Sequence, residues 1–338
     1  MTRPLRAAFA LGAALLLAAP PAVALQPASP PAAVGWPQAT SNLKADPAIR
    51  FGVLPNGMRY AIRRQSVPAG QASLRLRIDA GSLMETDAQQ GLAHFLEHMA
   101  FNGSKNVKEG EMTKMLERLG LAFGPDTNAS TSFGQTIYML ELPKTDDETV
   151  DISLMLMRES ASNLLIEQAA VDRERGVVLS EERARDTPGY RIVKERLGFW
   201  LKGQRLPQRM PIGTVEVLKS APAAEVVDFY HRYYRPERTV LVAAGDFDVD
   251  AMEAKIRARF SDWQGVGPAG ADPVQGQVQP RGTEARLVVE PGAQLTLQIA
   301  WVAPPNLAPD TVARRKREVI ENLALAVVNR RFSRLARG

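Results

Sequence analysis

The chain has 338 residues, of which 45% are hydrophobic and 23% charged, a composition typical of a folded globular protein rather than a disordered one. Its formal net charge is only +5, and the basic residues are dispersed, which argues against nucleic acid as a partner. The sequence contains no cysteine, so the fold must be stable without disulfides.

The N-terminus has the pattern of a secretory signal peptide. Arg3 and Arg6 precede an apolar run over residues 7–19, and Ala22-Val23-Ala24 follows as a cleavage site. This predicts a signal peptide over residues 1–24 and an exported protein, periplasmic or secreted. Loss of the two arginines changes the formal charge from +5 to +3. The run is too short to cross about 30 Å of hydrocarbon, and no later segment is long and apolar enough, so we expect no stable membrane span.

Residues 25–45, rich in proline and alanine, are interpreted as a flexible tether before a domain over residues 46–263. Within this domain, Asn56-Gly57 predicts a hairpin over 52–62, and alternating apolar residues predict a strand over 73–79. Gly120 is placed to end a helix over 110–119, and residues 121–142 are extended in pattern. Further expected elements are helices over 150–165, 168–185, 222–234 and 250–260, and a buried strand over 239–244. The fold class is therefore α+β: a mixed, mainly antiparallel sheet with helices packed on one face.

The sequence pattern of the C-terminal part predicts the incomplete start of a second, similar α+β domain. Residues 264–282, rich in Gly, Pro and Gln, are interpreted as a linker. In residues 283–338, alternation from Leu295 to Trp301 predicts a strand, and Asp310 is a candidate cap for a long helix that ends near Arg337. One strand and one helix cannot bury a core by themselves, so this piece needs a partner.

The strongest chemical signal lies between residues 91 and 102, in His94-Phe-Leu-Glu97-His98. On a helix, two histidines at i and i+4 lie on the same face and can direct ring nitrogens to one ion. Leu92, Phe95, Leu96 and Met99 form an apolar stripe on the opposite side. Glu97 lies beside the open coordination position without being a ligand, where a general base is needed.

Solvated surface histidines would be an alternative explanation of this pattern. The chain has only three histidines, however, and two of them share this face with a carboxylate at the right offset. We therefore favour a metal site. The third histidine, His231, lies among tyrosines and arginines and is interpreted as a packing or surface residue.

The motif and its surroundings, M-A-F-N-G-S after it and D-T-N-A-S-T-S-F downstream, resemble the pitrilysin/insulinase family of metallopeptidases. The resemblance implies a zinc endopeptidase that cleaves peptides or unfolded segments, with one Zn2+ per chain. The family's spacing implies His94, His98 and Glu174 as ligands and Glu97 as the base. It also implies that Glu167, seven residues before Glu174, orients or tunes the site, although a solvated helix face explains Glu167 equally well.

The resemblance further implies that a substrate peptide adds as a strand to the sheet edge at Asn128 and Ala129. An ordinary turn and strand remains the alternative for this segment. The choice of Glu174 as third ligand rests on the family spacing alone, because sequence physics does not separate it from Glu181 or Glu182.

The chain departs from the family in one respect. The family's second half carries an Arg and Tyr pair that holds the substrate, and neither residue can be placed here. A second homologous half, or another copy of the chain, would then complete the site. The alternative function is a non-catalytic scaffold, or a periplasmic peptide- or metal-binding subunit of the same fold that needs a partner half.

Overall fold

A computed structural model describes residues 35–336, so the predicted signal peptide and the first part of the tether lie outside the described residues. Its centre is a six-stranded sheet in the order β1-β2-β6-β3-β5-β4. Only β2 and β6 run parallel, and all other neighbours are antiparallel, which confirms the predicted mixed sheet. The strands are β1 (Ile49–Val53), β2 (Arg59–Arg64), β3 (Ala72–Ile78), β4 (Thr127–Thr131), β5 (Thr136–Leu142) and β6 (Thr239–Gly245).

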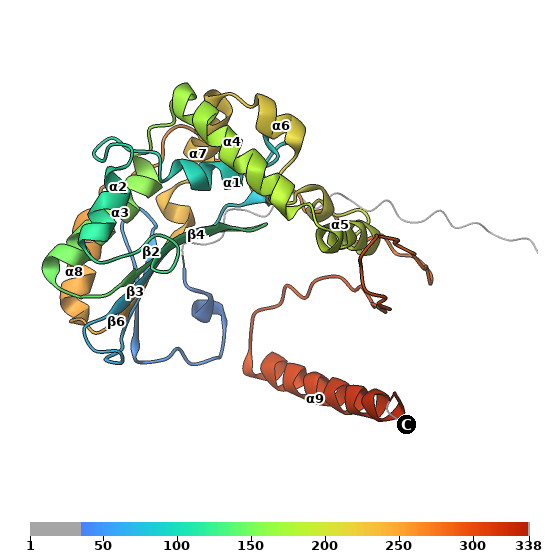
Figure 1. Ribbon diagram of the computed structural model, residues 1–338. Coiled ribbons are helices and arrows are strands. Elements are labelled where there is room, and N and C mark those ends of the chain that lie inside the picture. Colours follow the sequence, from blue (N-terminus) through green and yellow to red (C-terminus); the bar gives the residue numbers. More distant parts are fainter. Residues whose placement is uncertain (1–34, 337–338) are drawn as a thin grey trace, which may run out of the picture.

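Helices cover one face of this sheet, as the alternation in β3 requires. Leu74, Leu76 and Ile78 are fully buried toward the helices, whereas Arg75 and Arg77 lie on the opposite face. The covering helices are α1 (Leu92–Met99), α3 (Asp147–Ser162), α7 (Ala223–Tyr233) and α8 (Val249–Phe260) (Figure 1). The predicted hairpin is confirmed as β1 and β2, with Gly57 at φ 89° in the turn.

Helix α4 (Gln168–Arg185) passes beside α1, on the side away from the sheet (Figure 1). The helix continues through Gly176 without a break. The guanidinium of Arg175 donates to the carbonyls of Leu218 and Ala221 and so ties α4 to α6 (Val215–Ser220). Helix α2 (Glu111–Arg118) ends before Gly120, as predicted. Helix α5 (Pro188–Trp200), capped by Thr187, was not predicted from the sequence.

The predicted strand from Leu295 to Trp301 is wrong, since these residues form no regular structure. Leu295 and Leu297 are 101% and 88% exposed, and a strand without a hydrogen-bonded neighbour is not stable. Helix α9 (Val312–Leu335) is present but is capped by Thr311, not Asp310, and buries no residue. Within residues 35–336, no helix is both long enough and apolar enough to cross a bilayer.

Candidate active site

Helix α1 presents the motif from a fixed position. Its apolar stripe, including Phe95 and Leu96, is buried in the core. At its N-terminus, the carboxyl oxygens of Glu85 accept hydrogen bonds from the backbone N–H of Gly91 at 3.0 Å and of Ala93 at 2.9 Å. Amides in the first turn of a helix have no partner within the helix, so Glu85 satisfies two groups that would otherwise be buried and unpaired.

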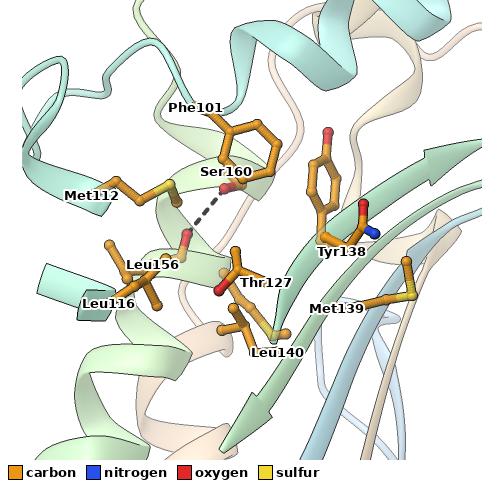
Figure 2. Close-up of a pocket in the computed structure, with 11 residues that line it drawn as sticks. Phe101, Met112, Leu116, Thr127, Tyr138, Met139, Leu140, Leu156 and Ser160 are labelled. Atoms are coloured by element: carbon orange, nitrogen blue, oxygen red, sulfur yellow. Dashed lines mark hydrogen bonds between the residues drawn. The ribbon is translucent and has the colours of Figure 1, made fainter. Parts of the chain in front are cut away.

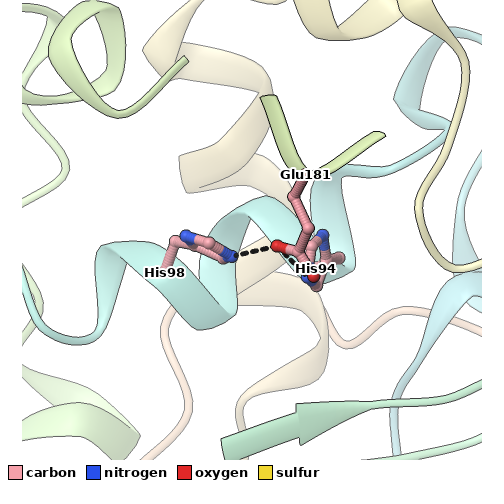
Figure 3. Close-up of side chains that lie close together, drawn as sticks. All are labelled: His94, His98 and Glu181. Atoms are coloured by element: carbon pink, nitrogen blue, oxygen red, sulfur yellow. Dashed lines mark ion pairs between the residues drawn. The ribbon is translucent and has the colours of Figure 1, made fainter. Parts of the chain in front are cut away.

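Three side chains converge above α1 (Figure 3). Nε2 of His94 lies 3.6 Å from Oε2 of Glu181, and Nε2 of His98 lies 3.3 Å from the same oxygen. One donor atom from each residue lies within 4.8 Å of the other two. Two imidazole nitrogens and one carboxylate oxygen are the protein ligands of many catalytic zinc sites, so the donor set fits this ion.

Glu174 lies elsewhere than the sequence prediction placed it. Its Oε1 is 2.8 Å from Nδ1 of His98, on the side of the ring away from the converging nitrogens. Its Oε2 accepts a hydrogen bond of 3.1 Å from Asn102. Glu181, two helical turns later on α4, takes the position expected of Glu174, and Glu174 takes the supporting position expected of Glu167. Glu167 itself is exposed at the start of α4.

The surroundings of His94 keep its imidazole neutral, so that a ring nitrogen can bind a metal ion. Burial and the neighbouring His98 lower the pKa of His94 to about 4, so this imidazole is neutral at pH 7. Burial alone would lower the pKa of His98, but the hydrogen bond to Glu174 and the nearby carboxylates outweigh it and raise that pKa. Nδ1 of His94 is buried and has no hydrogen-bond partner among the residues that the structure describes.

Glu97 lies close enough to His98 and Glu181 for their charges to act on it, but it is not one of the three converging residues. Only 9% of it is exposed, and its Oε2 accepts a hydrogen bond from the hydroxyl of Thr131. Burial raises the pKa of Glu97 above its usual value, and the Thr131 hydroxyl partly opposes this shift. A buried carboxylate with a raised pKa is suited to accept a proton near neutral pH.

Strand β4 forms the edge of the sheet and ends at Thr131, next to Glu97. Asn128 is exposed on this strand, and its Oδ1 accepts a hydrogen bond of 2.8 Å from the N–H of Ala129. Both residues therefore lie on the edge strand of the sheet.

An apolar pocket lies beside β4, between α2, α3 and β5 (Figure 2). Phe101 and Met112 line it on one side and Tyr138 on the other. Its volume is about 20 Å³, room for about one water molecule, so the lining is closely packed.

Sequence reasoning missed two contacts of this site, those of Asn102 with Glu174 and of Thr131 with Glu97. Asn102 lies four residues after His98, in the turn that follows α1, and its side chain donates to the carbonyl of His98, so closeness in sequence is the local signal. Thr131 has no comparable local signal, because the packing of β4 against α1 decides its contact. Glu181 is one of the residues that the sequence leaves open as an alternative to Glu174 for the third ligand.

Comparison with known proteins identifies related chains. Residues 60–198 match the family model described as "Insulinase (Peptidase family M16)", and residues 220–315 match "Peptidase M16 inactive domain". A "Probable zinc protease PqqL" of Haemophilus influenzae is 32% identical over 86% of this chain and 32% of its own length. A "Zinc protease PQQL-like" of Arabidopsis thaliana is 30% identical over 85% of this chain and 30% of its own. The chain spans about a third of the length of these relatives.

Solved structures of related proteases are also similar to this chain. The first half of the periplasmic protease PqqL from Escherichia coli is 34% identical, with a TM-score of 0.65 over 69% of this chain and 50% of that one. The complete PqqL from the same organism is 33% identical, with a TM-score of 0.66 over 70% of this chain and 26% of that one. With the two family models, these similarities show that the chain belongs to peptidase family M16, the insulinase/pitrilysin family.

Proposed function

We propose that this chain binds one zinc ion through His94, His98 and Glu181 and hydrolyses peptides or unfolded polypeptide segments with Glu97 as general base. The observation that carries the proposal is the convergence of both Nε2 atoms on the Glu181 carboxylate, with the buried Glu97 beside them. The relatives named as zinc proteases support the reaction class.

The chemistry that zinc supplies when bound is the acidification of a water molecule and the polarisation of the peptide carbonyl. Glu97 takes the proton from the attacking water and returns it to the leaving amine. Glu174 holds the ring of His98 through Nδ1, so that Nε2 is directed into the site. Asn102 in turn fixes Glu174.

The substrate would bind as an extended strand along β4. An edge strand offers unpaired backbone groups, to which a peptide can add with main-chain hydrogen bonds. Asn128 and Ala129 lie on this edge, and β4 leads directly to Glu97 through Thr131. This mode selects extended or unfolded segments rather than folded proteins.

We further propose that the protein is exported and acts in the periplasm or outside the cell. The sequence pattern of residues 1–24 supports this, as does the description of the Escherichia coli relative as periplasmic. Residues 264–282 are proposed as a linker, and residues 283–338 as part of a second α+β domain. The exposed apolar side chains from Leu287 to Trp301 support a homologous second half, or another copy of the chain, as partner.

A second candidate function is a peptide- or metal-binding subunit, or a scaffold, that does not cleave. The match of residues 220–315 to a domain described as inactive favours it, as does the chain's coverage of only a third of its relatives.

The test combines metal analysis with cleavage of a quenched fluorescent peptide by the purified chain, with and without a chelator. The proposal expects one zinc per chain and cleavage that the chelator stops. Glu97→Gln should keep the zinc and lose cleavage by at least about 100-fold. Zinc without cleavage in the unmutated chain would favour the binding subunit, and absence of zinc would refute both metal-dependent functions.

A further inference from the structure

We propose that the hydroxyl of Thr131 is a positioning group for Glu97, which holds one carboxylate oxygen so that the other faces the reacting water. This inference rests on the proposed function, because it assigns Glu97 the role of base. Its basis is the hydrogen bond from Oγ1 of Thr131 to Oε2 of Glu97, which joins β4 to α1 across the site.

The direction of this hydrogen bond follows from its acceptor, because an ionised carboxylate accepts and does not donate. Thr131 on β4 is paired with Thr136 on β5, and their hydroxyl oxygens are 3.4 Å apart. The hydroxyl of Thr136, which is 1% exposed, donates to the carbonyl of Ala80 at 3.0 Å. A threonine hydroxyl has one proton, and that of Thr136 is engaged, so Thr136 donates nothing to Thr131. The single proton of Thr131 goes to the closer of its two acceptors, Oε2 of Glu97.

The arrangement leaves the two oxygens of Glu97 in different states. Oε2 accepts a hydrogen bond from the Thr131 hydroxyl, whereas Oε1 has no side-chain hydrogen-bond partner within residues 35–336. A base that is held at one oxygen loses less rotational freedom when it accepts a proton at the other. Because Thr131 ends the edge strand, a peptide that adds to β4 binds to the element that orients the base.

The test compares Thr131→Val, which keeps the side-chain shape and removes the hydroxyl, with Thr131→Ser, which keeps the hydroxyl. For Thr131→Val we expect kcat to fall by about tenfold to 100-fold, with KM and zinc content unchanged. Thr131→Ser should restore kcat to within about threefold of the unmutated chain. Thr113→Val, the same exchange on α2, is the matched control and should leave kcat unchanged.

A purely structural role would give a different pattern: both Thr131 variants would raise KM or lower the zinc content through displacement of β4. An unchanged kcat in Thr131→Val would also overturn the proposal.

A crystal structure of Thr131→Val supplies a readout that does not depend on turnover. We expect the Glu97 carboxylate to adopt a different rotamer, or two, when the hydroxyl is removed. An unchanged single rotamer would refute the positioning role even if the unmutated chain cleaves peptides. A chain that neither binds zinc nor cleaves would refute the proposed function, while the rotamer comparison would still decide the contact.

Discussion

The carboxylate of Glu174 lies 2.8 Å from Nδ1 of His98, on the opposite side of the ring from Nε2, which faces Glu181. One imidazole is therefore held between two glutamates that are seven residues apart on α4. A metal-bound histidine commonly donates its other ring N–H to a carboxylate, which fixes the ring and makes it a better ligand. We therefore propose different roles in zinc binding for the two glutamates.

We expect Glu181→Gln to weaken zinc binding by more than about 100-fold, because a ligand is removed, and Glu174→Gln to weaken it by about 10- to 100-fold. Titration of the apo-protein with zinc against a competing chelator measures both. Glu182→Gln, the adjacent residue on the same helix, is the control and should change the affinity by less than about twofold. A larger effect for Glu174→Gln than for Glu181→Gln would restore the ligand set that the family spacing implies.

The buried carboxyl group of Glu85 predicts a pH dependence of stability. Burial raises the pKa of Glu85 to about 8, although the N–H groups of Ala93 and Gly91 and the charge of Arg209 act in the opposite direction. An acid with a raised pKa in the folded state binds a proton that the unfolded chain releases at about pH 4.5. Its contribution to stability is therefore complete below pH 4.5 and is lost as the pH rises through about 8.

Glu85→Gln tests this prediction, because the amide that replaces the carboxyl group does not titrate. As the pH rises from 5 to 8, the free energy of unfolding of the unmutated chain should fall relative to that of Glu85→Gln by up to about 1.4 kcal/mol per pH unit. Urea unfolding at a series of pH values measures it. A difference that is constant over this range would mean that Glu85 is already ionised in the folded protein.

The elements that the sequence predicts well are those with a strong local period. The alternation of Leu74, Leu76 and Ile78 predicts β3, and the apolar stripe of α1 predicts both the helix and the face that carries His94 and His98. In these cases the burial of one face determines the type of element, and the spacing of apolar residues in the sequence identifies that face.

The third converging residue could not be predicted in the same way. Glu167, Glu174 and Glu181 follow one another at seven-residue intervals, so they share one face of α4 and the helical period does not separate them. The position of α4 along its own axis relative to α1 determines which glutamate faces the histidines. Tertiary contacts, such as that of Arg175 with Leu218, fix this position. The segment from Leu295 to Trp301 fails for a related reason, since a strand depends on a neighbour that its own sequence does not describe.

The edge position of Asn128 predicts an effect on substrate binding. We expect Asn128→Ala to raise KM by about threefold to tenfold, the range for one lost hydrogen bond, without a change in zinc content. Steady-state kinetics on a quenched fluorescent peptide measures KM and kcat separately. Asn306→Ala, in the exposed C-terminal coil, serves as control and should leave both constants unchanged. An unchanged KM in Asn128→Ala would remove this side chain from the proposed substrate site.

The backbone contact between Gly213 and Gly91 predicts that the N-terminus of α1 tolerates no added atom. Gly213 has φ +81°, and a Cβ there would lie 2.4 Å from the Cα of Gly91. Gly110, before α2, has a similar φ of +77° but nothing within 4 Å of its Cβ position. Both Gly→Ala exchanges incur the penalty of a left-handed backbone, about 1–2 kcal/mol, and only Gly213→Ala adds overpacking of about 1–3 kcal/mol.

We therefore expect Gly213→Ala to lower the free energy of unfolding by about 1–3 kcal/mol more than Gly110→Ala, as measured by urea unfolding. Because the contact lies at the start of the helix that carries His94 and His98, Gly213→Ala should also weaken zinc binding, whereas Gly110→Ala should not. Equal losses of stability in the two variants would show that the chain near Gly213 moves away from α1 without strain. In that case zinc affinity should be the same in both.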